Sequence, residues 1–240
     1  RVGAAVKNNE GEWVLLNGNQ TALMFVYYLI TRWKELGKIN GKEYIVKTIV
    51  TTETIKTIAE RNGVEMYDVY TGFKWIANVM RENEGKKNYI GGGEESYGFL
   101  CEDFVRDKDA VSACVILAEI AAWAKDQGLS LYQLLQKIYV EYGFSKEKGI
   151  SVVKKGKSGA EEIEAMMKKF RENPLTEIAG SKVTYFYDYS TLKGKDYAEN
   201  ETVTLDMPTT SNVLQYFTED NTKVSIRPSG TEPKIKFYCE

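Results

Sequence analysis

Histidine is absent from this 240-residue sequence. Without histidine the chain cannot form a Ser-His-Asp triad or a histidine-ligated metal centre. Any proton transfer within the chain must therefore use lysine, aspartate, glutamate, tyrosine or cysteine. Cysteine is also scarce, since only Cys101, Cys114 and Cys239 occur, an odd and widely spaced set that favours a reducing compartment over a disulfide framework. We therefore expect a cytoplasmic protein.

The sequence also lacks an excess of one charge and any long apolar run. Its 32 basic and 34 acidic residues give a formal net charge of −2 and are spread along the whole chain. No basic face therefore indicates a surface for nucleic acid or for an anionic membrane. No apolar run approaches the roughly 20 residues of a membrane span. We expect neither nucleic acid nor membrane as a partner, so small anionic ligands would be bound locally.

The hydrophobic content of 43% is sufficient for the core of one large domain or of two modest ones. The chain opens on Arg1 rather than on methionine, and strand-like residues begin at once. We therefore expect it to be part of a longer protein.

The first 143 residues alternate between predicted strands and helices, which favours an α/β layer fold. Apolar residues at helical spacing and glycine stops predict the helices, and β-branched runs predict the strands. The predicted helices cover residues 19–36, 74–83, 109–127 and 131–142, with a further helix that contains Ile55, Ile58 and Ala59 and is closed by Asn62-Gly63. The predicted strands cover residues 1–7, 43–51, 64–70 and 88–90.

After Gly143 the pattern changes to one strand, one helix and then only strands, which favours a small α+β domain with an antiparallel sheet. Ser158 and Glu161 predict a capping box at the start of the helix, and Pro174 predicts its end. The predicted strands lie near residues 150–154, 182–189, 202–205, 213–217, 223–226 and 235–239.

Residues 227–234, with the sequence RPSGTEPK, lie between two predicted strands and contain the parts of a phosphate site. Arg227 can hydrogen-bond two phosphate oxygens through its planar guanidinium, Ser229 and Thr231 offer hydroxyls, and Gly230 lets backbone N–H groups approach closely. Two prolines stiffen the loop, which lowers the entropic cost of ordering it around a ligand. The simpler alternative is an ordinary polar turn.

Residues 91–98, with the sequence GGGEESYG, follow a predicted strand and expose a carboxylate and a hydroxyl. Such groups suit a sugar, because a carboxylate can accept hydrogen bonds from two neighbouring hydroxyls. The alternative is a glycine-rich turn with solvated glutamates. A nucleotide site is excluded by spacing, since Ser96 stands where a dinucleotide fingerprint needs its third glycine and Ser151 where a Walker motif needs its first.

Both loops match the α-D-phosphohexomutase family, the phosphoglucomutases and phosphomannomutases. Residues 227–234 resemble its RPSGTEPK phosphate-binding loop at every position, and residues 93–98 resemble its GEESYG sugar-recognition loop. The resemblance implies that Glu94 and Ser96 contact sugar hydroxyls. It also implies that the phosphate that is not being transferred is bound by four residues of the second loop, namely Arg227, Ser229, Gly230 and Thr231.

Two lysines are further candidates on this resemblance. Thr71-Gly72-Phe73-Lys74 resembles a family loop that senses which end of the hexose is bound, which makes Lys74 a sugar or phosphate contact unless it is a solvated lysine. Lys47 aligns with a strand-end lysine of the cleft for which proton transfer has been suggested. There are two alternatives: Lys47 is a charged residue on an edge strand, or it balances the negative charge of a bound phosphate.

The resemblance implies the third and fourth domains of a four-domain enzyme. Residues 1–143 would form the sugar-recognition domain, with a mixed sheet and flanking helices. Residues 144–240 would form the phosphate-binding domain, with an antiparallel sheet like that of the TATA-box-binding protein. The segment after the family's magnesium loop is matched by Arg1-Val2-Gly3 and by WVLLNGNQ at residues 13–20. The magnesium ligands and the phosphoserine would then precede this chain, and no cofactor would be bound by it.

The implied reaction interconverts hexose 1-phosphate and hexose 6-phosphate through an enzyme phosphoserine and a bisphosphorylated sugar. On this interpretation the partners are hexose phosphates and the preceding domains, and the chain alone is inactive. The preference for glucose or mannose stays open, as does the alternative of a phosphosugar-binding or regulatory module without catalysis.

Overall fold

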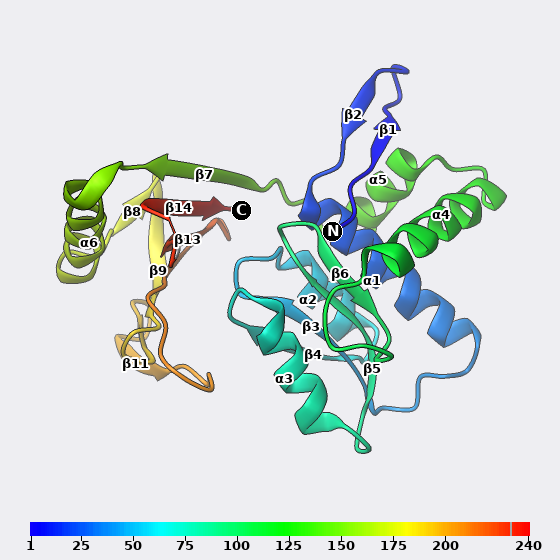
Figure 1. The fold of residues 1–240 in the computed structure, drawn as a ribbon, viewed down its shortest axis with the longest axis horizontal. Coiled ribbons are helices and arrows are strands. Elements are labelled where there is room, and N and C mark those ends of the chain that lie inside the picture. Colours follow the sequence, from blue (N-terminus) through cyan, green and yellow to red (C-terminus); the bar gives the residue numbers. More distant parts are fainter. Residues whose placement is uncertain (231) are drawn as a thin grey trace. The chain divides into compact units, whose positions relative to one another are not determined.

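The computed structural model describes residues 1–230 and 232–240, and they form two compact units, residues 1–145 and 146–240. Figure 1 colours the first unit from blue to green and the second from green to red. The sequence predicts a boundary after Gly143, and the units divide between Ser145 and Lys146. Within the described ranges, no helix combines the length and the apolar character needed to cross a bilayer.

The first unit is built on a four-stranded mixed sheet. Its strand order is β4 (Glu65–Val69), β3 (Glu43–Thr48), β5 (Asn88–Glu94) and β6 (Gly98–Cys101). Strands β4, β3 and β5 are parallel, whereas β6 pairs antiparallel with β5. A separate two-stranded hairpin consists of β1 (Ala5–Lys7) and β2 (Trp13–Leu15).

Helices cover both faces of this sheet. One core cluster joins four of the helices to Ile45, Ile90 and Phe99, and a second joins α3 to Tyr44, Val46 and Leu100, which point to the other face because side chains alternate along a strand. The helices of the first cluster are α1 (Gly18–Glu35), α2 (Thr54–Arg61), α4 (Ala110–Asp126) and α5 (Leu131–Tyr142), and α3 spans Phe73–Asn83. The predicted α/β domain with a mixed sheet is confirmed.

Helix α1 is the most deeply buried helix of the unit, with an unbroken buried run over residues 21–30. It begins with a reciprocal capping box, in which Asn17 Oδ1 accepts from the Gln20 N–H at 2.8 Å and Gln20 Oε1 accepts from the Asn17 N–H at 2.9 Å. The cap fixes where the helix begins. Its first residue, Gly18, lies close to the backbone of the predicted sugar loop.

The second unit is an antiparallel sheet with one helix, as the sequence predicts. Helix α6 (Gly156–Glu172) packs Ile163 and Met167 against Leu214, Tyr216 and Ile226 of the sheet. The strand order is β11 (Glu201–Thr204), β10 (Lys193–Asp196), β9 (Ser181–Asp188), β12 (Leu214–Thr218), β13 (Lys223–Pro228), β14 (Lys234–Cys239) and β7 (Lys148–Val153), and β8 (Glu177–Ile178) pairs with β9.

The predicted capping box of α6 is wrong. The helix begins at Gly156, and its N-cap residue Lys155 makes no side-chain capping hydrogen bond. Ser158 therefore lies inside the first turn and not ahead of it. The early start accompanies a close approach between Gly159 and the preceding chain, since a Cβ at Gly159 would lie 2.3 Å from the Lys154 carbonyl oxygen.

Candidate active site

The predicted sugar-binding residues gather at one edge of the first unit's sheet. Because β3, β4 and β5 are parallel, their carboxyl ends meet at this edge, where ligands of α/β proteins bind. Lys47 lies near the end of β3, Thr71 to Lys74 follow β4, and Glu94 is the last residue of β5.

Glu94 is a buried part of the sheet edge. Its side chain is 6% exposed, and its Oε1 accepts a hydrogen bond of 2.8 Å from the Gly72 N–H. The interpretation of Glu94 as a solvated turn residue is therefore wrong. The bond joins the predicted sugar loop to the Thr71–Lys74 loop, and a carboxylate has further lone pairs with which to accept from a ligand.

The glycines before Glu94 continue strand β5, so the turn is confined to Glu95, Ser96 and Tyr97. Close packing explains why glycine stands there: a Cβ at Gly92 would lie 2.3 Å from the Val46 carbonyl oxygen, and one at Gly93 would lie 2.6 Å from the Gly98 carbonyl oxygen. Bulkier residues would push β5 away from its neighbours and displace the carboxylate that follows.

Gly18 packs against the backbone of the predicted sugar loop, a contact that sequence reasoning missed. A Cβ at Gly18 would lie 1.9 Å from the Glu95 carbonyl oxygen. The loop is also held at its far end, where the Tyr97 carbonyl accepts from the Val2 N–H at 3.0 Å. Ser96 is half-buried between these two supports.

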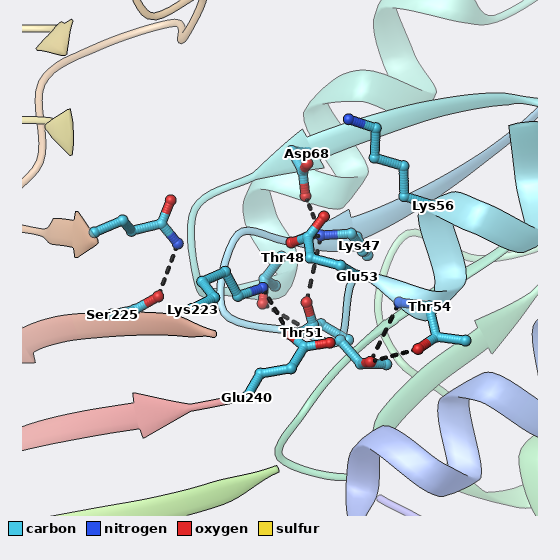
Figure 2. A network of polar contacts seen from close by, with 12 residues as sticks. Lys47, Thr48, Thr51, Glu53, Thr54, Lys56, Asp68, Lys223, Ser225 and Glu240 are labelled. Carbon is cyan, nitrogen blue, oxygen red and sulfur yellow. Dashed lines mark hydrogen bonds and ion pairs between the residues drawn. The ribbon is translucent and has the colours of Figure 1, made fainter. Parts of the chain in front are cut away.

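Lys47 lies at the centre of a polar network near the end of β3 (Figure 2). Its side chain is 1% exposed, and its Nζ donates to Asp68 Oδ1 at 2.7 Å, to Glu53 Oε1 at 3.0 Å and to the Thr51 carbonyl at 3.3 Å. Burial would lower the pKa of Lys47, but the carboxylates of Asp68 and Glu53 outweigh it, and the pKa is raised above its ordinary value.

Strand β3 lies between β4 and β5, so the interpretation of Lys47 as the charge of an edge strand is wrong. Sequence reasoning missed both of its carboxylate partners. Asp68 stands opposite Lys47 in the parallel β3–β4 ladder, and this register is not visible until the strands are paired.

Lys74 is exposed on the first turn of α3, with its Nζ 5.0 Å from the centre of the Trp75 ring. This cation–π contact leaves the ammonium in solvent. The role of Lys74 as a ligand contact stays a prediction.

The predicted phosphate loop of the second unit connects β13 to β14. The Ser229 N–H donates to the Lys234 carbonyl at 2.8 Å, and Lys234 forms an ion pair with Glu232, which lowers the pKa of Glu232. The loop is therefore closed on itself at its base. Arg227 is half-buried beside it on β13, Gly230 is exposed at its tip, and Thr231 lies outside the described residues.

A pocket of about 520 Å³ opens between this loop and helix α6. Ser229 and Gly230 line its loop side, and Ile163 and Met167 line its helix side. The two loops thus belong to different units, each with its own local framework, and the roles of their residues as ligand contacts stay predictions.

The described residues provide no group of three or more Asp, Glu, Cys or His side chains placed to hold a metal ion. The side chains on these ranges therefore do not fit the magnesium that the family resemblance implies, and no step of the chemistry is assigned to a metal here.

Comparison with known families decides what kind of protein this is. The family model described as phosphoglucomutase/phosphomannomutase, α/β/α domain III, matches residues 17–142, more than half of the chain. The chain belongs to this family. The resemblance inferred from the two loops is thereby confirmed.

This chain is similar to phosphoglucomutases over almost its whole length. The protein of Staphylococcus aureus strain MRSA252 is 37% identical over 238 residues, and that of Staphylococcus haemolyticus is 33% identical over 238 residues. Both alignments cover 99% of this chain and 42% of the relative. The chain thus spans less than half the length of these curated relatives.

Solved structures agree on the fold. A Paramecium phosphoglucomutase, parafusin, superposes with a TM-score of 0.63 at 16% identity over 98% of this chain and 38% of its own. A Thermus thermophilus protein described as a putative phosphomannomutase gives 0.59 at 16% identity over 98% of this chain and 41% of its own. At such low identity these matches show the fold alone.

Proposed function

We propose that this chain supplies the sugar-binding and phosphate-binding part of a phosphohexomutase that interconverts hexose 1-phosphate and hexose 6-phosphate. The observation that carries the proposal is the buried Glu94, whose hydrogen bond to Gly72 ties the family's sugar-recognition sequence to the Thr71–Lys74 loop. A solvated glycine-rich turn would have no reason to bury a carboxylate at the carboxyl edge of a parallel sheet.

The proposed chemistry explains why sugar recognition and phosphate recognition lie on separate loops. A bisphosphorylated intermediate has to turn around between two phosphoryl transfers, so the phosphate loop must accept either end of the sugar. Arg227, Ser229 and Gly230 hold the phosphate that is not reacting, and Glu94 and Ser96 hold sugar hydroxyls in both orientations. Thr231 belongs to the same proposed phosphate set.

The phosphoryl carrier and magnesium belong, on this proposal, to the part of the relatives that this chain does not match. The residues described above bind the substrate, orient it and exclude water from it. This division makes the chain a binding half that carries no turnover by itself, and we place the assembled enzyme in the cytoplasm.

Turnover tests the proposal directly. We expect the purified chain to form no glucose 6-phosphate from glucose 1-phosphate, even with magnesium and glucose 1,6-bisphosphate, as followed by ³¹P NMR. We expect a chimera, in which this chain replaces the matching 42% of the S. aureus MRSA252 phosphoglucomutase, to catalyse the conversion. Parallel assays with mannose 1-phosphate would give the sugar preference.

The control is the same chimera carrying Glu94→Ala, which should fold but lose most of its turnover. Conversion by the chain alone would place the phosphoryl carrier within these residues and refute the division of labour. A folded chimera that binds glucose 6-phosphate without turnover would instead favour a phosphosugar-binding module, the second candidate suggested by the limited share of the relatives that the chain covers.

A further inference from the structure

The Lys47 network is connected to the predicted sugar loop through one buried threonine. Thr51 is fully buried, and its Oγ1 accepts a hydrogen bond of 3.1 Å from the Glu95 N–H. The same oxygen shares a hydrogen bond of 2.8 Å with Thr48 Oγ1. Glu95 stands between Glu94 and Ser96 in the sequence. The position of Thr51 therefore determines where the backbone of the proposed sugar contacts lies relative to β3.

Lys47 fixes the segment that carries Thr51. An ammonium group has three N–H donors, and Lys47 directs them at three parts of the fold: Asp68 on β4, Glu53 ahead of α2, and the carbonyl of Thr51 itself. Figure 2 shows these contacts converging on the lysine nitrogen. The Lys47 ammonium therefore binds two residues of the turn between β3 and α2 and joins this turn to β4.

We propose that Lys47 and Thr51 are positioning residues for the sugar-recognition loop, with Lys47 acting as an anchoring cation rather than as a proton carrier. The inference rests on the proposed function of that loop. It extends that function by naming the residues that hold Glu94 and Ser96 at a fixed distance from β3.

The surroundings of Lys47 support an anchor over a proton carrier. A general base works best with a pKa near the working pH, whereas Asp68 and Glu53 raise the pKa of Lys47 further from neutrality. Proton donation to a sugar would also remove one of the three N–H donors that these contacts use. The geometry therefore favours a lysine that keeps its proton throughout the reaction.

A pair of Thr51 variants tests the proposal in the 240-residue chain. Thr51→Val removes the hydroxyl while keeping the shape, and Thr51→Ser keeps the hydroxyl. We expect Thr51→Val to shift the backbone amide resonances of Glu95 and Ser96 without ligand. We also expect it to weaken glucose 6-phosphate binding about tenfold while leaving inorganic phosphate binding unchanged, because only the sugar contacts move. Thr51→Ser should restore both readouts.

Matched controls separate positioning from general destabilisation. Thr57→Val and Lys56→Met alter the same residue types on α2. Lys56 is exposed and pairs with Glu60 at 3.8 Å, so these changes should alter neither the Glu95 amide nor the affinity ratio. Lys47→Met should shift the same amides as Thr51→Val, and the double variant should add little, as expected for residues acting in one path.

An unmoved Glu95 amide in Thr51→Val, or an affinity ratio unchanged from wild type, would overturn the proposal. Full turnover of the Thr51→Val chimera, together with complete loss of turnover in the Lys47→Met chimera, would favour the interpretation of Lys47 as a proton carrier. Should Lys47→Met fail to fold, the Thr51→Val and Thr51→Ser pair still decides. The amide shifts need no ligand. A wild-type chain that binds no hexose phosphate would therefore refute the proposed function, while the Glu95 amide in Thr51→Val would still decide whether Thr51 positions the loop.

Discussion

Gly92→Ala is expected to destabilise residues 1–145 by about 3 kcal/mol, the upper end of the usual cost of overpacking. The added Cβ would lie 2.3 Å from the Val46 carbonyl oxygen and 2.8 Å from the Tyr89 hydroxyl oxygen, and the backbone carbonyl cannot retreat without separating β5 from β3. All four tryptophans, Trp13, Trp33, Trp75 and Trp123, lie in this unit, so urea unfolding followed by tryptophan fluorescence reports on it alone.

Gly3→Ala is the matched control for this change. A Cβ at Gly3 meets nothing within 4 Å, and the substitution should alter the unfolding free energy by no more than about 0.5 kcal/mol. Equal stability of the Gly92 and Gly3 variants would show that the glycine run is not fixed by packing, and the structural explanation of the GGGEESYG sequence would fail.

Arg227→Lys is expected to weaken the binding of hexose phosphates at least tenfold, although the charge is conserved. Arginine presents a planar pair of N–H donors to two phosphate oxygens, and the lysine ammonium cannot reproduce this parallel geometry. A charge-assisted hydrogen bond contributes about 1.5–3 kcal/mol, so the loss of one accounts for a tenfold change or more. Isothermal titration calorimetry of the 240-residue chain would measure the effect.

Glucose 1-phosphate and glucose 6-phosphate should lose affinity together, because the loop is proposed to hold the phosphate in both orientations of the sugar. Arg32→Lys, at a half-buried site on α1 paired with Glu35, serves as the control and should bind like wild type. Undiminished affinity in Arg227→Lys would show that residues 227–234 form a turn and not the phosphate site.

The order of helices and strands could be predicted because it depends on local patterns. Helix α5 (Leu131–Tyr142) has the predicted bounds, since Ser130 forms a capping box with Gln133 and Gly143 ends it. Strands that depend on pairing with other strands were not predicted from the sequence, or were predicted too short. Strands β6 and β10 are four residues long, and β5 continues through its glycines only because β3 and β6 hold it on both sides.

The site could be predicted as two short sequences but not as an arrangement. The two loop sequences and their resemblance to the family predicted Glu94 and Arg227 as ligand contacts, whereas the Gly72 partner of Glu94 follows a different strand, 22 residues away. The alternatives for Lys47 could not be separated from sequence because its partner Asp68 faces it only across the β3–β4 ladder. Contacts of this kind depend on the register between paired strands, which cannot be read from a single sequence.

A titration of the ¹⁵N-labelled chain with glucose 6-phosphate tests the central claim most directly. The amides of Ser229 and Gly230 and those of Glu94, Glu95 and Ser96 should shift with one dissociation constant. In Glu94→Gln, which keeps the shape and removes the charge, the phosphate-loop shifts should persist while the sugar-loop shifts weaken. Saturating ligand that leaves the amides of both loops unmoved would contradict the assignment of this chain as the sugar-binding and phosphate-binding part of a phosphohexomutase.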